Sequence, residues 1–255
     1  MKLLTFHRGN SKLSKKVWHT SLPSGFTCPF ANLCLSKANR KTGKITDGQN
    51  TEIRCFSASQ EALFPTVRND RWNNFDLLRG LDFTGMYNLI LLSLPEQAEI
   101  IRIHVAGDFF NQNHFNAWLA IAEDNPHILF YAYTKSIPFW LKHRENKILP
   151  PWSAGPDNFV LTASYGGRHD NLIELNQLKY SKIVFSKEEA RQLGLKIDTT
   201  DGYAMKKSSG GFALLLHGVQ PAGSQASKEL QILKSQNEYG YGKKSAKRKE
   251  KKCSV

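Results

Sequence analysis

The chain has 255 residues, of which 40% are hydrophobic and 22% are charged. This composition is typical of a globular protein and excludes a disordered or membrane-embedded one. The net charge is +13, no apolar run approaches the ~20 residues that a bilayer-spanning helix needs, and the apolar part of the N-terminus is too short for a secretory signal peptide. We therefore expect a cytoplasmic protein without membrane contact, in which thiols stay reduced.

The first 26 residues contain no long periodic segment, and we expect them to form an extended arm. The next stretch, residues 27–59, is polar and rich in turn-forming residues, yet it holds Cys28, Cys34 and Cys55. Cysteines used only for packing tend to lie singly in buried apolar runs. Three of them in a loop-like segment of a reduced protein predict a metal-binding segment.

Two helices are expected after this segment. The first follows Cys55, with Ser57 or Ser59 as its cap, Glu61 in its first turn, and Pro65 breaking or kinking it. The second is expected over Phe83–Leu94, before Pro95.

From residue 100 onward, apolar strands alternate with helices. This order predicts an α/β fold with a mostly parallel sheet of βα units, and it does not distinguish an open sheet from a partial, TIM-like barrel. Residues 1–235 are expected to form one domain with an irregular cysteine-bearing segment, and residues 236–255 a flexible lysine-rich tail. The strands are expected at Ile100–Val105, Ile128–Thr134, Phe159–Ser164, Lys182–Phe185 and Phe212–His217, and the helices at Asn116–Glu123, Pro138–His143 and Lys187–Leu193.

Polar residues follow the ends of these strands. Each has an ordinary structural role open to it: Asp108 could cap the next helix, and His104 could be a hydrogen-bonded core residue. Functional groups nevertheless collect at the carboxyl ends of parallel strands, so we expect a pocket there. Its predicted lining residues are Asp108, Tyr133, Lys135 and Arg168.

The spacing of the cysteines does not identify the metal. Five residues separate Cys28 from Cys34, and twenty separate Cys34 from Cys55. Zinc sites typically contain a Cys-x₂₋₄-Cys pair, and the common ferredoxin spacings differ too. A fourth ligand could be a histidine, with His217 or His104 preferred, or a carboxylate, the tail residue Cys253, or an atom of a bound molecule.

Several long motifs resemble the phage gene product 88 family. They cover most of residues 10–230 and occur in the family's order. The resemblance implies a bacteriophage protein located in the host cytoplasm or in the virion. The motifs are SLPSGFTCPFANLC, TEIRCFSASQEALFP, IRIHVAGDFFNQNHFNAW, FYAYTKSIPFW and LLLHGVQPAGSQA.

A looser resemblance, in overall plan, is to radical S-adenosylmethionine enzymes, in which three cysteines precede the βα units of a partial barrel. It implies a 4Fe–4S cluster with one open iron and S-adenosylmethionine as a further cofactor. The compact Cys-x₃-Cys-x₂-Cys loop of those enzymes is absent here.

Three functional hypotheses follow. The preferred one is an iron–sulfur protein with a redox or electron-transfer role and a redox partner. The second is a radical S-adenosylmethionine-type enzyme acting on a small molecule. The third is a zinc-stabilised nucleic-acid-binding protein, whose basic tail, with seven Lys or Arg between Lys243 and Lys252, binds nucleic acid nonspecifically.

Overall fold

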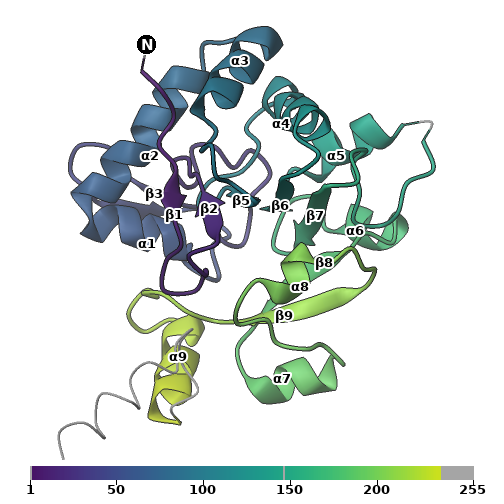
Figure 1. The fold of residues 1–255 in the computed structure, drawn as a ribbon. Helices are drawn as coiled ribbons and strands as arrows, with labels where there is room; N and C mark the ends of the chain where they lie inside the picture. The colour runs from purple at the N-terminus through teal and green to yellow at the C-terminus, as the bar shows by residue number, and fades with distance from the viewer. Residues whose placement is uncertain (1, 146, 237–255) are drawn as a thin grey trace, which may run out of the picture.

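A seven-stranded sheet organises the computed structural model, which describes residues 2–145 and 147–236 (Figure 1). The strand order is β1-β2-β5-β6-β7-β8-β9, and every neighbouring pair is parallel except β1 with β2. The strands are β1 (His7–Arg8), β2 (Val17–His19), β5 (Ile100–Ile103), β6 (Leu129–Thr134), β7 (Phe159–Ser164), β8 (Tyr180–Val184) and β9 (Gly211–Leu215).

The strand order never reverses along the chain, unlike that of a doubly wound sheet. Because successive crossovers are right-handed, connections that all advance in one direction place their helices on the same face and leave the other face for the interior of a barrel. In the described residues the edge strands β1 and β9 do not pair, so the barrel is not closed. The α/β fold with a mostly parallel sheet is confirmed, and the sheet is consistent with a partial barrel.

The main core lies between the sheet and the group α3, α4 and α5, which sit together in Figure 1. Alternate strand residues such as Ile101, Phe130 and Leu161 are buried there against Trp118 of α4 and Trp140 of α5. The helices are α1 (Phe56–Leu63), α2 (Pro65–Leu78), α3 (Phe83–Ser93), α4 (Gln112–Asp124), α5 (Ile137–Arg144), α6 (Asn171–Leu175), α7 (Lys187–Gln192), α8 (Gly202–Met205) and α9 (Gln225–Ser235).

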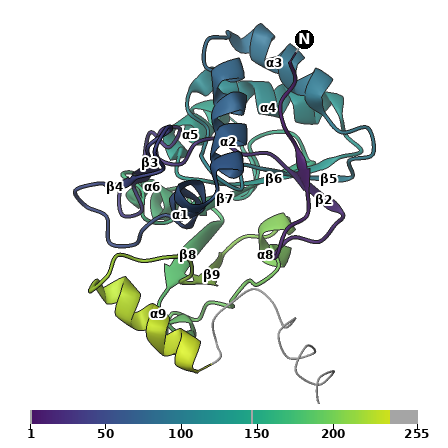
Figure 2. The same cartoon turned by 90° about the vertical axis from the view of Figure 1, so that its left-hand side faces the viewer.

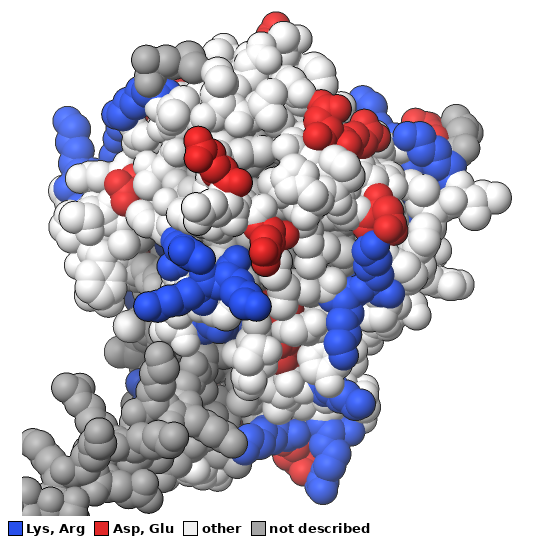
Figure 3. Space-filling view, in the orientation of Figure 1, with Lys and Arg blue, Asp and Glu red and all other residues white. Residues whose placement is uncertain are grey.

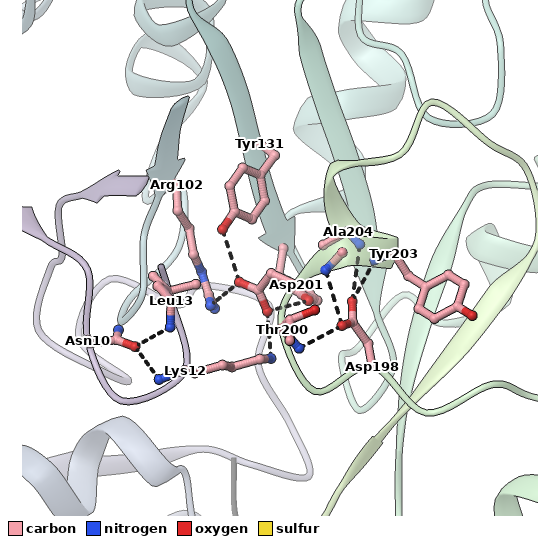
Figure 4. A network of polar contacts seen from close by, with 12 residues as sticks. Asn10, Lys12, Leu13, Arg102, Tyr131, Asp198, Thr200, Asp201, Tyr203 and Ala204 are labelled. Carbon is pink, nitrogen blue, oxygen red and sulfur yellow. Dashed lines mark hydrogen bonds and ion pairs between the residues drawn. The ribbon is translucent and has the colours of Figure 1, made fainter. Parts of the chain in front are cut away.

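The opposite face of the sheet carries a buried polar network around Asp201 (Figure 4). Its carboxylate, fully enclosed, forms 2.5 Å ion pairs with Lys12 and Arg102 and accepts 3.1 Å hydrogen bonds from the hydroxyls of Tyr131 and Tyr133. Burial alone would raise the pKa of Asp201, but Arg102 and Lys12 hold that pKa below its usual value. The network joins the N-terminal arm to the C-terminal part of the sheet.

A second carboxylate fixes the loop that presents Asp201. Asp198 accepts backbone N–H bonds from Thr200, Gly202, Tyr203 and Ala204, which satisfies the first turn of α8 (Figure 4). Asp201 is the N-cap of α8 and has a φ of 62°, a left-handed conformation that aspartate tolerates better than most residues.

The predicted strands and helices are found, with ends shifted by a few residues, and several local expectations are corrected. The arm contributes β1 and β2 to the sheet. These strands were not predicted, because two and three residues are too few to show periodicity. The predicted caps Ser57 and Ser59 lie inside α1, whose N-cap is Cys55. Pro65 ends α1 as predicted, but it also begins α2, where proline lacks only an N–H that would be unpaired anyway.

Residues 237–255, including Cys253 and nearly all of the predicted tail, lie outside the described residues. Figure 2 shows α9, the last described helix, at the opposite end of the molecule from α3. None of the described helices is both long and apolar enough to cross a membrane. On the face in Figure 3, Lys and Arg form separate groups with acidic side chains between them, and not one continuous basic surface.

Candidate functional site

The three clustered cysteines line one cavity of about 140 Å³. Cys28, Cys34 and Cys55 are each partly exposed. The cavity opens at the carboxyl ends of β5, β6 and β7, as expected for a parallel sheet. The sheet contributes mainly polar side chains to it, and these are Arg102, His104, Asp108, Tyr133, Thr134, Lys135 and Ser164.

A β-hairpin accounts for the long interval between the second and third cysteines. Strand β3 (Ser36–Ala38) begins two residues after Cys34, and its partner β4 (Ile45–Asp47) runs back antiparallel to it. The register pairs Ser36 with Asp47 at the open end. Most of the twenty-residue interval therefore leaves the cavity and returns to it.

Backbone hydrogen bonds then complete the return to Cys55. The carbonyl of Leu33 accepts from the N–H groups of Glu52 and Ile53 at 2.9 and 3.1 Å, and the Cys55 N–H donates to Ser36 Oγ at 3.3 Å. These bonds hold the third cysteine beside the second without any compact cysteine loop.

The loop carrying the first two cysteines is held by the end of β7. The Gly166 carbonyl accepts from the N–H groups of Asn32 and Leu33 at 3.1 and 3.0 Å, and the Arg168 N–H donates to the Phe30 carbonyl at 2.9 Å. Gly166 has a φ of 95°, a conformation that favours glycine. The turn after β7 thus holds the cysteine loop in place through backbone hydrogen bonds.

Gly107 provides the other close contact between the cysteine segment and the sheet. Its φ is 81°, and a Cβ there would lie 2.5 Å from Thr27 Oγ1 and 2.8 Å from the Leu22 Cβ. Only glycine allows the segment that enters Cys28 to pack this closely on the end of β5.

We therefore expect Gly107→Ala to lower the free energy of unfolding by roughly 2–5 kcal/mol, combining left-handed strain with overpacking. Gly194→Ala is the matched control, because Gly194 also has a positive φ of 66° but no atom within 4 Å of an added Cβ. Urea denaturation of both variants measures the difference. Equal losses in the two would show that the contact with Thr27 is unimportant.

The surroundings of Cys28 and Cys55 disfavour ionisation in the absence of a cation. Burial raises the pKa of Cys28 well above its usual value, and the Asp108 and Cys55 charges add to that rise. Burial, then Cys34, raises the pKa of Cys55. A metal ion would reverse this, since coordinated thiols are deprotonated.

Backbone N–H groups lie near two of the sulfurs. The Gly25 N–H donates to Cys28 Sγ at 3.4 Å. Cys55 is the N-cap of α1, and the nearby backbone N–H groups of Ala58 and Ser57 oppose the rise in its pKa. Donors of this kind would stabilise thiolate ligands.

The two candidate histidines lie in different places. His104 lines the cavity with a φ of 62°, is 3% exposed, and neither ring nitrogen has a hydrogen-bond partner. Burial lowers its pKa to about 3. His217 packs its ring on Phe56 at 4.8 Å, its Nδ1 lies 2.9 Å from the Leu215 carbonyl, and it is not among the lining residues.

Three of the four predicted pocket residues line the cavity. Asp108 does not cap α4, whose N-cap is Asn111; it accepts from Thr134 Oγ1 at 2.6 Å and from the Lys135 N–H at 2.7 Å. Burial raises the pKa of Asp108, and these hydrogen bonds oppose it. Tyr133 and Lys135 also line the cavity, whereas Arg168 is exposed and outside its lining.

The predicted lining omitted Arg102, Ser164, Thr134 and Ser57, which also line the cavity. The first two carry a signal that could have been used. Along β5 and β7 every second residue faces the barrel interior, and Arg102 and Ser164 are polar members of that alternation. Ser57 carries no comparable signal, because it lies in a helix whose start was placed too late.

The donor set fits a metal centre in composition. In the described parts, 2–145 and 147–236, however, no three His, Cys, Asp or Glu side chains stand as a group ready to hold a metal ion. The thiols share a cavity without already forming a coordination site. What the structure offers is three soft ligands with N–H donors around one cavity.

Comparison with known proteins gives one family and one curated relative. The family model described as "Gene product 88" matches residues 3–237. The "Gene 88 protein" of Mycobacterium phage L5 is 28% identical over 151 residues, covering 54% of this chain. The chain spans about half, 56%, of that relative's length. No solved structure matches, and the expected similarity to radical S-adenosylmethionine enzymes is not shown.

Proposed function

This chain belongs to the gene product 88 family, and from that premise we propose that it is a phage-encoded iron–sulfur protein in which Cys28, Cys34 and Cys55 hold a 4Fe–4S cluster. Its role would be redox or electron transfer in the host cytoplasm. One observation carries the proposal: three cysteines separated by five and twenty residues line the same cavity.

The surroundings of the cavity support thiolate ligation. Arg102 and Lys135 line it and offset negative charge, and the Gly25 N–H donates a hydrogen bond to Cys28 Sγ. Hydrogen bonds to sulfur and local charge are the terms by which a protein sets the potential of such a centre. When bound, the cluster would supply one-electron chemistry. The protein's part is to ligate it, limit its solvent contact and set its electrostatic surroundings.

His104 is the better of the two predicted candidates for a fourth protein ligand. It lines the cavity with a neutral imidazole that has no other hydrogen-bond partner, and neutral imidazole is the form that binds metals. His217 already contacts the Leu215 carbonyl and Phe56.

The test is metal analysis of protein purified anaerobically without added metal. We expect iron and acid-labile sulfide in equal amounts, about four of each per chain, with the charge-transfer absorption of a cluster. Zinc without sulfide would overturn the proposal. It would favour the alternative of a zinc-stabilised nucleic-acid-binding protein, which the same three thiols and the net charge of +13 support.

A radical S-adenosylmethionine-type enzyme is a second candidate, favoured by the polar side of the same cavity. Asp108, Tyr133 and Lys135 lie at strand ends beside the thiols, where a substrate would meet both a metal centre and polar groups. Equilibrium dialysis of the iron-loaded protein against S-adenosylmethionine tests this candidate. Absence of binding at millimolar concentrations would remove it and leave the electron-transfer role.

A further inference from the structure

The cysteine cavity has two chemically different sides. Cys28, Cys34 and Cys55 form a sulfur side, contributed by the N-terminal segment. The strand ends form a polar side, which includes Tyr133, Lys135 and Ser164. A metal centre would occupy only the sulfur side. The role of the polar side would remain to be explained.

Lys135 is the central group of the polar side. Its Nζ donates to Ser164 Oγ at 2.7 Å, which uses one of the three N–H donors of an ammonium group. No ion pair involves Lys135 in the part of the chain that the structure describes. The Asp108 carboxylate also lines the cavity. It accepts hydrogen bonds from the Thr134 hydroxyl and from the backbone N–H groups of Phe109 and Lys135.

The glycine turn after β7 shapes the space around this lysine. A Cβ on Gly166 would lie 3.7 Å from Lys135 Cε, and one on Gly167 would lie 3.4 Å from Lys135 Cβ. The aliphatic stem of Lys135 therefore packs along the turn while its ammonium group lies at Ser164. Packing of the stem restricts the side chain, so a charge held there loses little conformational entropy on binding a ligand.

The Asp201 network supplies two residues of the same side. Arg102 and Tyr133 both line the cavity and both contact Asp201. Two cations, Lys12 and Arg102, share that single carboxylate (Figure 4). Arg102 therefore brings a second cationic side chain to the cavity lining, in addition to Lys135.

The size of the cavity limits what can enter. About 140 Å³ is well below the roughly 300–1,000 Å³ of pockets that enclose whole drug-sized ligands. Only a small molecule, or the end group of a larger one, can reach the polar side. Positive charge, hydroxyl groups and small volume together select a carboxylate or a phosphate group.

We propose that the polar side of the cavity binds the carboxylate or phosphate group of a small-molecule ligand, with Lys135 as its anchor. The anion would replace solvent as the partner of the remaining Lys135 donors. It would also meet the Ser164 hydroxyl, whose oxygen accepts from Lys135 Nζ and whose own O–H can donate. The inference concerns the same cavity as the proposed function. It rests on that function in one respect, namely that the ligand would be a substrate. The anion site itself requires no cluster.

The test is the thermal stability of the purified full chain in inorganic phosphate or sodium acetate, with sodium chloride keeping the ionic strength constant. A ligand that binds only the folded protein raises Tm, by roughly 3–6 °C for each tenfold increase in concentration above Kd for a chain of this size. A larger shift with phosphate would identify a phosphate site, and a larger shift with acetate a carboxylate site.

Lys135→Gln removes the charge but keeps a donor for Ser164, and Lys142→Gln removes an exposed charge outside the cavity. We expect the anion-dependent rise in Tm to be unchanged in Lys142→Gln. In Lys135→Gln the same rise in Tm should need at least a tenfold higher anion concentration. No rise in the wild type with either anion, or an equal rise in Lys135→Gln, would overturn the proposal. Iron and sulfide measured on the same samples keep this result separate from the fate of the cluster.

Discussion

Serine in place of Cys28, Cys34 or Cys55 is expected to remove most of the bound iron and sulfide, each substitution doing so by itself. Serine is nearly the size of cysteine, so the fold loses little packing, but its hydroxyl is a hard and weakly acidic ligand where a soft thiolate is needed. The cavity offers no spare thiol, because these are the three cysteines of the described residues. We expect metal content to fall by more than tenfold.

Cys253→Ser is the matched control, since the proposed ligand set of three cysteines and His104 does not include it. It should retain full metal content. Iron, sulfide and zinc are measured per chain by elemental and colorimetric analysis, and circular dichroism verifies that each variant is folded. Full metal retention in Cys55→Ser would remove that residue from the ligand set and contradict the site as proposed.

The largest effect on stability is expected from Asp201→Ala. Removing this carboxylate leaves Lys12 and Arg102 buried without their shared counter-charge and deprives Tyr131 and Tyr133 of an acceptor. Removing one partner of a buried ion pair costs about 3–5 kcal/mol. Burial lowers the pKa of Lys12 although the Asp201 carboxylate opposes that shift, so the charge on Lys12 depends on Asp201.

Two further variants separate the causes. Asp157→Ala breaks the ion pair with Lys207, which spans 2.6 Å with the Asp157 side chain 92% exposed, and should cost at most about 1 kcal/mol. Asp201→Asn keeps the shape and tolerates the left-handed backbone, so it isolates the loss of charge. Urea midpoints at neutral pH give all three values. A cost for Asp201→Ala no larger than for Asp157→Ala would show that the network is not a stabilising element.

Much of the sheet could be predicted from the sequence because its central strands are continuous apolar runs. β7 (Phe159–Ser164) matches its predicted range, and β6 differs by one residue. Strand β2 was not predictable in this way, since three residues carry no measurable period and its place in the sheet depends on pairing with β5, eighty residues later.

Helix α2 shows a second limit of periodicity. Its buried face contains Arg68, Arg71 and Asn74, which are satisfied by hydrogen bonds and not by apolar packing. The Arg71 guanidinium donates to the Ser57 carbonyl and to Glu61. A helix with a polar inner face gives no apolar stripe, so the sequence pattern did not separate it from α1.

The candidate site was predictable in part for a simple topological reason. Residues that directly follow parallel strands meet at one edge, and this brings Asp108, Tyr133 and Lys135 to the same cavity. Arg168 lies four residues beyond the end of β7, where the chain has already turned to bond with Phe30. Distance along the loop, and not residue type, decides which side chains reach the cavity.

The hairpin between Cys34 and Cys55 changes what the interval of twenty residues means. Because β3 and β4 run side by side, that number measures how far an appendage extends from the cavity and says nothing of how far apart two ligands sit. Lengthening or shortening it at the tip, residues 39–44, would alter the count while the thiols stay in place, provided that the contact of Arg68 with the Arg40 carbonyl is accommodated. Genome searches that fix the gap between cysteines would therefore pass over proteins with the same arrangement of thiols, whereas searches that align the flanking motifs would find them.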